Sequence, residues 1–142
     1  MILVDANVLI YAVDSDAVHH REARSWLEGA LSGATPVGLA WIVSLAFLRV
    51  TTRHGLLRRP LGISQAVAYV DDWIAHPLVA TVVPGPEHWT ILRGLLRASG
   101  TAGNLTSDAH LAALAIERGA TVCTLDHDFR RFSGIEVTSP LS

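Results

Sequence analysis

Short apolar segments alternate with longer amphipathic segments along the whole chain, and this alternation constrains the fold more than any other feature. Segments of β-branched and apolar character, expected to be strands, span residues 2–4, 36–40, 78–83, 121–125 and 135–137. Segments with helical periodicity span residues 7–13, 18–31, 41–53, 64–76, 86–98 and 106–118. Strands separated by helices pair in parallel through right-handed crossovers, so the sheet is covered on both faces. The sequence therefore predicts a three-layer α/β/α fold with a mostly parallel central sheet of four to five strands.

Three residues mark expected helix boundaries. Ser64 is expected to be the N-cap of the helix that ends before Pro77, because its hydroxyl can accept a bond from a free N–H group. Pro86 suits the first turn of the next helix, where a missing N–H group costs little. Gly119 is expected to end the last helix in the left-handed conformation.

Length and composition indicate one domain over residues 1–142. Half of the residues are hydrophobic (50%), and 17% are charged, which argues against a disordered chain. Cys123 is the only cysteine, so a disulfide framework is excluded. The longest apolar run, residues 37–48, is shorter than the roughly 20 residues of a membrane span. Because the N-terminal segment carries Asp5 where a signal peptide carries a basic residue, we expect a cytoplasmic protein without a membrane segment.

The charged residues argue against a uniformly basic nucleic-acid-binding protein, because the formal net charge is −2. All 11 basic residues are arginines, whose planar guanidinium group binds phosphates and carboxylates through paired hydrogen bonds. One cluster, between residues 49 and 59, includes Arg49 and Arg53, and a second is the adjacent pair Arg130 and Arg131. Contact with an RNA backbone or an acidic partner and a simple solvated helix face both remain open for these arginines.

Four aspartates are expected near the carboxyl edge of the sheet, where open α/β domains carry their sites. Asp5 follows the first strand, Asp126 and Asp128 follow the strand at 121–125, and Asp108 lies in the first turn of the helix before it. Clustered carboxylates repel one another, so a divalent cation is the natural compensation, and oxygen ligands favour Mg²⁺ or Mn²⁺. Such a cation would polarise a phosphoryl oxygen and activate water. Each aspartate also has a purely structural interpretation, as a helix cap or a turn residue.

Several other site types are excluded by the sequence. The glycine-rich patterns of dinucleotide-binding and P-loop proteins are absent, and so is the serine elbow of the α/β hydrolases. The adjacent pair His19 and His20 lacks a third zinc ligand nearby in the sequence.

Three sequence blocks resemble those of PIN-domain ribonucleases. They are ILVDANVLIY at residues 2–11, NLTSDAHLAALAIE at residues 104–117 and TLDHDF at residues 124–129. Over nearly its whole length the chain resembles the VapC toxins of VapBC toxin–antitoxin pairs. The resemblance implies a Mg²⁺- or Mn²⁺-dependent endoribonuclease that hydrolyses phosphodiester bonds of RNA, with tRNA or rRNA as the usual substrate. It also implies a homodimer and inhibition by a cognate VapB antitoxin.

The resemblance assigns catalytic roles to Asp5, Asp108, Asp126 and Asp128. Among these, Asp5 and Asp108 match the principal metal ligands, and Asp126 matches the acidic residue of the last block and is expected to complete the metal site directly or through water. Asp128 matches a position that is often acidic or asparagine and is the weaker candidate. Asn7 and Thr124 match polar positions that support the site by hydrogen bonding. Arg49 and Arg53 remain weaker candidates for contact with RNA or antitoxin.

One departure from the family pattern affects the expected number of metal ions. Many relatives carry a glutamate three residues before the arginine of the middle helix, whereas Ala46 precedes Arg49 here. We therefore expect a single metal ion. The alternative is a catalytically inactive PIN-like module that binds RNA or antitoxin without cleavage. A phospho-accepting receiver domain shares the layered architecture, but it uses a lysine after a late strand and this chain has no lysine.

Overall fold

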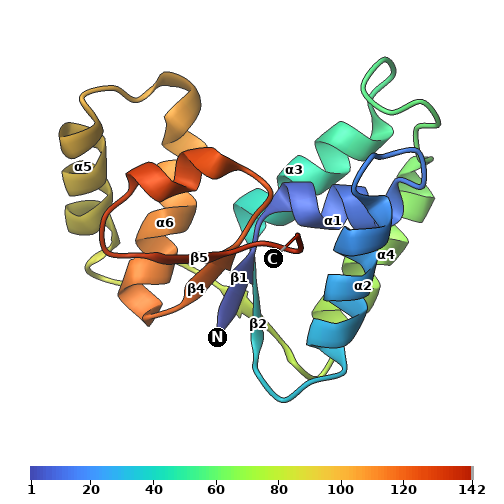
Figure 1. Cartoon of the computed structure of the whole chain (residues 1–142), viewed down its shortest axis with the longest axis horizontal. Helices are drawn as coiled ribbons and strands as arrows, with labels where there is room; N and C mark the ends of the chain where they lie inside the picture. The colour runs from blue at the N-terminus through green and yellow to red at the C-terminus, as the bar shows by residue number, and fades with distance from the viewer. Residues whose placement is uncertain (142) are drawn as a thin grey trace.

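The computed structural model describes residues 1–141 around a five-stranded parallel sheet, whose strand order is β3-β2-β1-β4-β5 (Figure 1). The strands are β1 (Ile2–Val4), β2 (Val37–Ala40), β3 (Val79–Val82), β4 (Thr121–Cys123) and β5 (Glu136–Thr138). Every neighbouring pair is parallel. The predicted three-layer α/β/α architecture is confirmed, with five strands.

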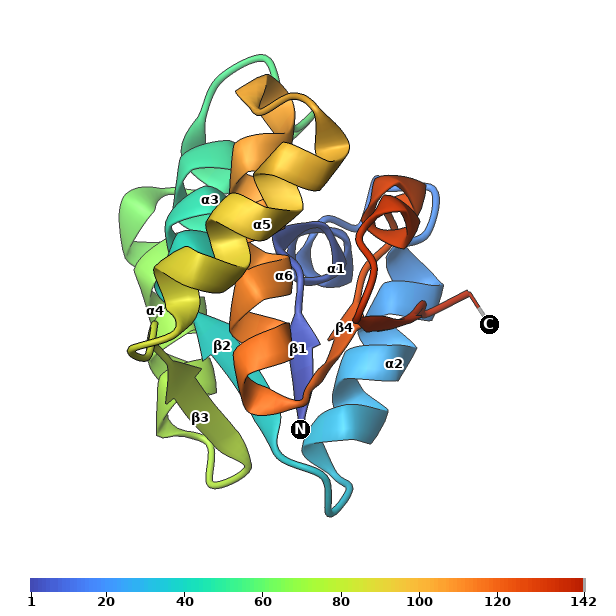
Figure 2. The same ribbon diagram turned by 90° about the vertical axis from the view of Figure 1, so that its left-hand side faces the viewer.

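Helices cover both faces of the sheet. The six α-helices are α1 (Ala6–Val13), α2 (His20–Leu31), α3 (Trp41–Thr52), α4 (Ile63–Ala75), α5 (His88–Ser99) and α6 (Thr106–Arg118). Two short 3₁₀ helices, η1 (Gly103–Leu105) and η2 (His127–Arg131), complete the chain. Figure 1 shows α5 and α6 on one side of the sheet and α1, α2 and α4 on the other, and Figure 2 shows the α5 side. Among the described residues, no helix is long and apolar enough to cross a membrane.

The centre of the sheet is buried on both faces. Leu3 and Val4 of β1 are almost completely inaccessible to solvent. Gly38, which pairs with Leu3 on the neighbouring strand, leaves room for the Leu3 side chain. A Cβ atom at this position would overlap the Leu3 side chain and lie 2.9 Å from Cγ2 of Val82. The absence of a side chain at Gly38 is therefore a packing requirement of the central strands.

Two of the predicted helix boundaries are wrong. The N-cap of α4 is Gly62 and not Ser64. The side chain of Gln65 accepts a hydrogen bond from the backbone N–H of Gly62 at 3.4 Å, so the helix begins before Ser64. Pro86 lies before α5, since the Glu117 carboxylate binds the backbone N–H groups on either side of it. Gly119 ends α6 with φ of 62°, as predicted.

The topology brings the ends of two central strands together. The register pairs Val4 of β1 with Cys123 of β4, and the backbone N–H of Asp5 donates to the Cys123 carbonyl at 2.9 Å. Each residue that follows these strands therefore lies at the same edge of the sheet. Ala40 ends β2, and α3 begins directly at Trp41, so α3 also starts from this edge.

Candidate functional site

A cavity of about 410 Å³ opens at the carboxyl edge of the sheet. Three carboxylates from three separate elements line it: Asp5 after β1, Asp108 in the first turn of α6 and Asp126 before η2. One face of α3 forms the opposite wall with Ile42, Val43, Leu45, Ala46 and Arg49. The fold therefore collects acidic side chains from both ends of the sequence in one place.

The Asp5 carboxylate is oriented by hydrogen bonds. It is the N-cap of α1, and its Oδ1 accepts from the backbone N–H of Ala6 at 2.8 Å. Its Oδ2 accepts from the Thr124 hydroxyl at 2.8 Å and from Nδ2 of Asn7 at 3.3 Å. A carboxylate has about four lone-pair positions, so these bonds leave one for a further ligand. The capping and the site interpretations of Asp5 are thus compatible.

Thr124 joins the two strand ends. Its hydroxyl donates to Asp5 and accepts from Nδ2 of Asn7 at 3.2 Å and from the backbone N–H of Asp126 at 3.0 Å. The side chain of Asn7 in turn accepts from the backbone N–H of Leu125 at 3.1 Å. Because Thr124 is only 2% exposed, its single proton and both of its acceptor positions are used within the protein. This network fixes the position of Asp5 relative to Asp126.

Asp108 is the carboxylate whose ionisation is most perturbed. Burial first, and then the charges of Asp5, Asp126 and Asp128, together raise its pKa to about 6. The pKa of Asp5 is also raised, first by burial, although its hydrogen bonds from Thr124 and Ala6 oppose the shift. Within residues 1–141, no ion pair joins a basic side chain to any of the three cavity carboxylates. Their mutual repulsion is therefore uncompensated by the protein itself.

Asp126 and Asp128 occupy different environments. Oδ1 of Asp126 accepts from the backbone N–H of Asp128 at 2.9 Å, which is the turn geometry expected of an aspartate that caps η2. Asp128 does not line the cavity, is exposed and lies 3.9 Å from Arg131. The structure thus brings three of the four predicted aspartates together and leaves Asp128 outside, where it acts on Asp108 only through its charge.

The cavity carboxylates are suited to hold Mg²⁺ or Mn²⁺ together with water and substrate, but not to surround a metal ion with protein ligands only. Among the described residues, no group of three or more His, Cys, Asp or Glu side chains is close enough to hold an ion jointly. Mg²⁺ is commonly held by one or two carboxylates together with water and substrate phosphate. Asp5, Asp108 and Asp126 offer such oxygen ligands, and the cavity has room for water. Ala46 lines the same cavity, so the missing glutamate of the family pattern removes a carboxylate from its wall.

Ala46 and Arg49 of α3 were connected with the site from the sequence, but the apolar residues Ile42, Val43 and Leu45 of the same cavity wall were not predicted. Ile42, Leu45, Ala46 and Arg49 share one helical face, with the i, i+3, i+4 spacing that could have revealed it. Of the two arginines proposed for contact with RNA or antitoxin, Arg49 lines the cavity and Arg53 lies one turn beyond it.

A histidine pair joins α5 and α6 outside the set of residues that line the cavity. Nε2 of the buried His88 lies 2.9 Å from Nδ1 of His110, two residues after Asp108 on α6. Burial, and then the charge of His88, lower the pKa of His110. The two histidines come from different helices and show no sequence signal.

Comparisons with known sequences agree with the sequence blocks described above. Residues 2–135 match the family model described as PIN domain. The chain is 48% identical to Ribonuclease VapC37 of Mycobacterium tuberculosis, an alignment that covers 99% of this chain and 97% of that protein. It is 40% identical to Ribonuclease VapC33 of the same organism, with 99% of each chain covered.

Comparisons with solved structures give the same fold. The VapBC2 complex of Rickettsia felis, bound to a DNA fragment from its promoter, contains a chain with a TM-score of 0.71 at 19% identity, with 98% of each chain covered. VapC20 of Mycobacterium tuberculosis, a toxin that cleaves the sarcin-ricin loop, gives a TM-score of 0.70 at 18% identity, with 96% of this chain and 99% of that chain covered.

Proposed function

Because the chain belongs to the PIN domain family and groups within it with the VapC ribonucleases, we propose that it is a divalent-metal-dependent endoribonuclease. Its role would be that of the toxin of a toxin–antitoxin pair. The match over nearly the whole chain supports this proposal, since the relatives carry no additional domain to which the ribonuclease name could belong.

The observation that carries the proposal is the uncompensated carboxylate cluster in the cavity. Burial of several negative charges without a basic partner is costly, and proteins retain such arrangements at functional sites. Burial, and then the negative charges of this cluster, raise the pKa of Asp108 to about 6. Binding a divalent cation would offset that repulsion.

We assign Mg²⁺ or Mn²⁺ to Asp5 and Asp108, with Asp126 completing the site directly or through water. When bound, such an ion supplies a Lewis acid for the phosphoryl group and lowers the pKa of water in the site. The Thr124 hydroxyl holds Asp5 in a fixed orientation for this purpose. Arg49 on the opposite wall offers a guanidinium group to the negative charge of the phosphodiester.

Each carboxylate has a distinct role in this proposal. Asp108 is mostly ionised above its pKa of about 6, so it is available as a ligand at neutral pH. Asp126 uses one oxygen to cap η2, and its other oxygen can accept a proton from a water molecule in the cavity. Asp128 would act by adding negative charge outside the cavity wall.

The partners are proposed from the relatives and neighbours. The Rickettsia felis neighbour was solved as a VapBC complex, which supports a VapB-type antitoxin that binds and inhibits this chain. The VapC20 neighbour is described as cleaving the sarcin-ricin loop, which supports structured RNA, rRNA or tRNA, as the substrate. We propose a homodimer from the family resemblance alone.

Cleavage of total cellular RNA by the purified protein tests the proposed function. Discrete new RNA ends are expected with Mn²⁺ or Mg²⁺, and none with EDTA or with the Asp108→Asn variant. Addition of the antitoxin encoded beside the gene should abolish cleavage. Cleavage that persists in EDTA would contradict metal dependence.

The alternative, an inactive PIN-like module, rests on Ala46 in the cavity wall. In that case RNA or antitoxin would bind with similar affinity in the presence and absence of metal. No new RNA ends would form, even from a folded protein shown to bind Mn²⁺.

A further inference from the structure

A basic surface begins at the cavity and continues outward along α3. We call residues 49–59, the outer end of α3 and the loop after it, the basic arm. Arg49, Arg53 and Arg58 on the arm are exposed and form no ion pair or hydrogen bond within the described part of the chain. Three guanidinium groups are therefore available for an external ligand.

The arm carries no compensating negative charge of its own. Between Glu28 and Asp71 the sequence contains no acidic residue. The basic residues on the other side of the cavity, in η2, differ in this respect because they follow Asp126 and Asp128 directly and Arg131 lies 3.9 Å from Asp128. Asp16 of another loop pairs with Arg59, but the other three arginines of the arm have no ion-pair partner within the described residues, so the arm is the side of the cavity with net positive charge.

The arm is also held in a defined position. The Arg59 guanidinium donates from Nε and Nη2 to the two carboxylate oxygens of Asp16, both at 3.0 Å, and from Nη2 to the Ser15 hydroxyl at 3.2 Å. Leu57 is buried beneath the loop, and the backbone N–H of Leu61 donates to the Thr51 carbonyl at 2.8 Å. A ligand would therefore meet arginines whose backbone is already ordered, which lowers the entropic cost of binding.

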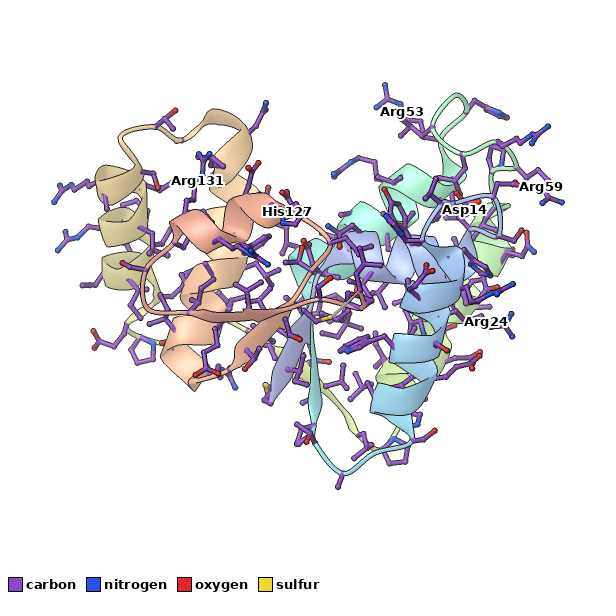
Figure 3. All side chains as sticks on the ribbon, in the orientation of Figure 1. Asp14, Arg24, Arg53, Arg59, His127 and Arg131 are labelled. Carbon is purple, nitrogen blue, oxygen red and sulfur yellow. The ribbon has the colours of Figure 1, made fainter. Side chains whose placement is uncertain are left out.

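The direction of α3 orders these arginines relative to the cavity. Arg49 lines the cavity wall, and Arg53 follows one turn later, about 6 Å farther along the helix axis. Figure 3 shows Arg53 at the outer end of α3, pointing away from the body of the protein, whereas His127 and Arg131 lie over η2. The positive charges thus form a track that leads away from the carboxylates.

We propose that the basic arm binds the phosphates of the RNA strand next to the bond that is cleaved, an inference that rests on the proposed function. The cavity carboxylates repel a polyanion, so groups beside the cavity must attract it. Arginines spaced outward from the cavity, at the end of α3 and in the loop after it, suit successive phosphates, because each contact releases condensed counterions and strengthens binding at low salt. The arm contributes affinity, and the cavity carries the chemistry.

Binding of single-stranded RNA tests the arm separately from cleavage. The probe is a fluorescein-labelled mixed-sequence RNA of about 20 nucleotides, titrated with the full-length Asp108→Asn variant in Mg²⁺ between about 50 and 200 mM NaCl. The added substitutions Arg53→Gln and Arg58→Gln should weaken binding on the order of tenfold at the lower salt concentration and reduce the slope of log K against log[salt] by about 1.4, since two phosphate contacts are lost.

The matched control replaces the exposed residues Arg93 and Arg97 with glutamine, which removes the same amount of charge. Both lie on α5, on the other side of the molecule from α3 (Figure 1). This control should leave the affinity and the salt slope close to those of the parent. In an otherwise wild-type enzyme, the arm variant should raise KM on the order of tenfold at unchanged kcat. Thermal unfolding checks that both double variants fold.

Three outcomes would overturn the proposal. The first is unchanged RNA affinity in the arm variant, and the second is an equal loss in the α5 control, which would reveal a general charge effect. The third is loss of antitoxin binding with intact RNA binding, which would assign the arm to an acidic protein partner. Binding measured on the Asp108→Asn background does not require turnover, so absence of cleavage by the wild type would count against the proposed function alone.

Discussion

Replacement of Asp108 by asparagine should stabilise the metal-free protein while it abolishes cleavage. Asp108 has a folded-state pKa of about 6 against an ordinary value of 3.8, so its ionised form is disfavoured in the folded state. The cost of folding with this group ionised is present at pH values above about 6. It disappears as the pH falls below 3.8, where the group is protonated in both states.

The magnitude follows from the size of the shift. A shift from 3.8 to about 6 corresponds to roughly 3 kcal/mol, at about 1.4 kcal/mol for each pKa unit. Asp108 is only half-buried, so solvent screens its interactions and about 1–1.5 kcal/mol is the realistic gain. Asparagine keeps the shape of the side chain and removes only the charge.

Urea unfolding in EDTA at pH 7.5 and pH 4 measures this effect, with the exposed Asp72→Asn on α4 as the matched control. The free energy of unfolding of Asp108→Asn should exceed that of the wild type by about 1 kcal/mol at pH 7.5 and by less than half of that at pH 4. Mn²⁺ should reverse the order at pH 7.5, because only the wild type keeps the full ligand set. Equal stability at both pH values would refute the claim that the cavity carboxylates repel one another.

The remaining predictions concern neighbouring positions. Thr124→Val should lower kcat and destabilise the protein by about 1–2 kcal/mol, because Asp5 and Asp126 lose their hydrogen bonds to the hydroxyl. Thr124→Ser keeps the hydroxyl and should retain most activity, so an equal loss in both variants would contradict the role of the hydroxyl. Gly38→Ala should cost about 1–3 kcal/mol in urea unfolding, since its Cβ would overlap Leu3; an unchanged midpoint would contradict the packing argument. Ala46→Glu adds a carboxylate to the cavity wall and should tighten Mn²⁺ binding measured by calorimetry, whereas an unchanged Kd would exclude this position from the site.

Much of the fold could be predicted because each strand is a short apolar run with a clear helical pattern on either side. The first residues of the helices were harder to predict from the sequence. Ser64 is a better N-cap by residue type than Gly62, yet the helix begins earlier because Gln65 binds back to the Gly62 backbone. Pro86 lies outside α5 because Glu117, 31 positions later in the sequence, holds the preceding turn. Such long-range contacts leave no local signal.

The acidic part of the site could be predicted from the positions of Asp5 and Asp126 after parallel strands. Functional sites of parallel α/β sheets lie at the carboxyl ends of the strands, so the residues that follow these strands were expected to lie in the site. Only the family resemblance ranked Asp128 below Asp126, because the turn that directs one into the cavity and the other outward depends on a hydrogen bond from the backbone N–H of Asp128 to the Asp126 carboxylate. The apolar residues of the α3 wall were missed because they are also typical of a helix packed in the core.

Single-turnover cleavage of a mapped RNA substrate with Mn²⁺, compared between the wild type, Asp5→Asn and Asp72→Asn, tests the central claim most directly. Asparagine is also a good N-cap, so Asp5→Asn keeps an oxygen for the bond from Ala6 that starts α1. It replaces the charged oxygen that accepts from Thr124 and Asn7 with an NH2 group, and so removes the negative charge from the cavity. We predict wild-type rates for Asp72→Asn and a loss of at least about 1,000-fold, roughly 4 kcal/mol of transition-state stabilisation, for Asp5→Asn. Cleavage by Asp5→Asn at the wild-type rate would contradict the assignment of this cavity as the catalytic site.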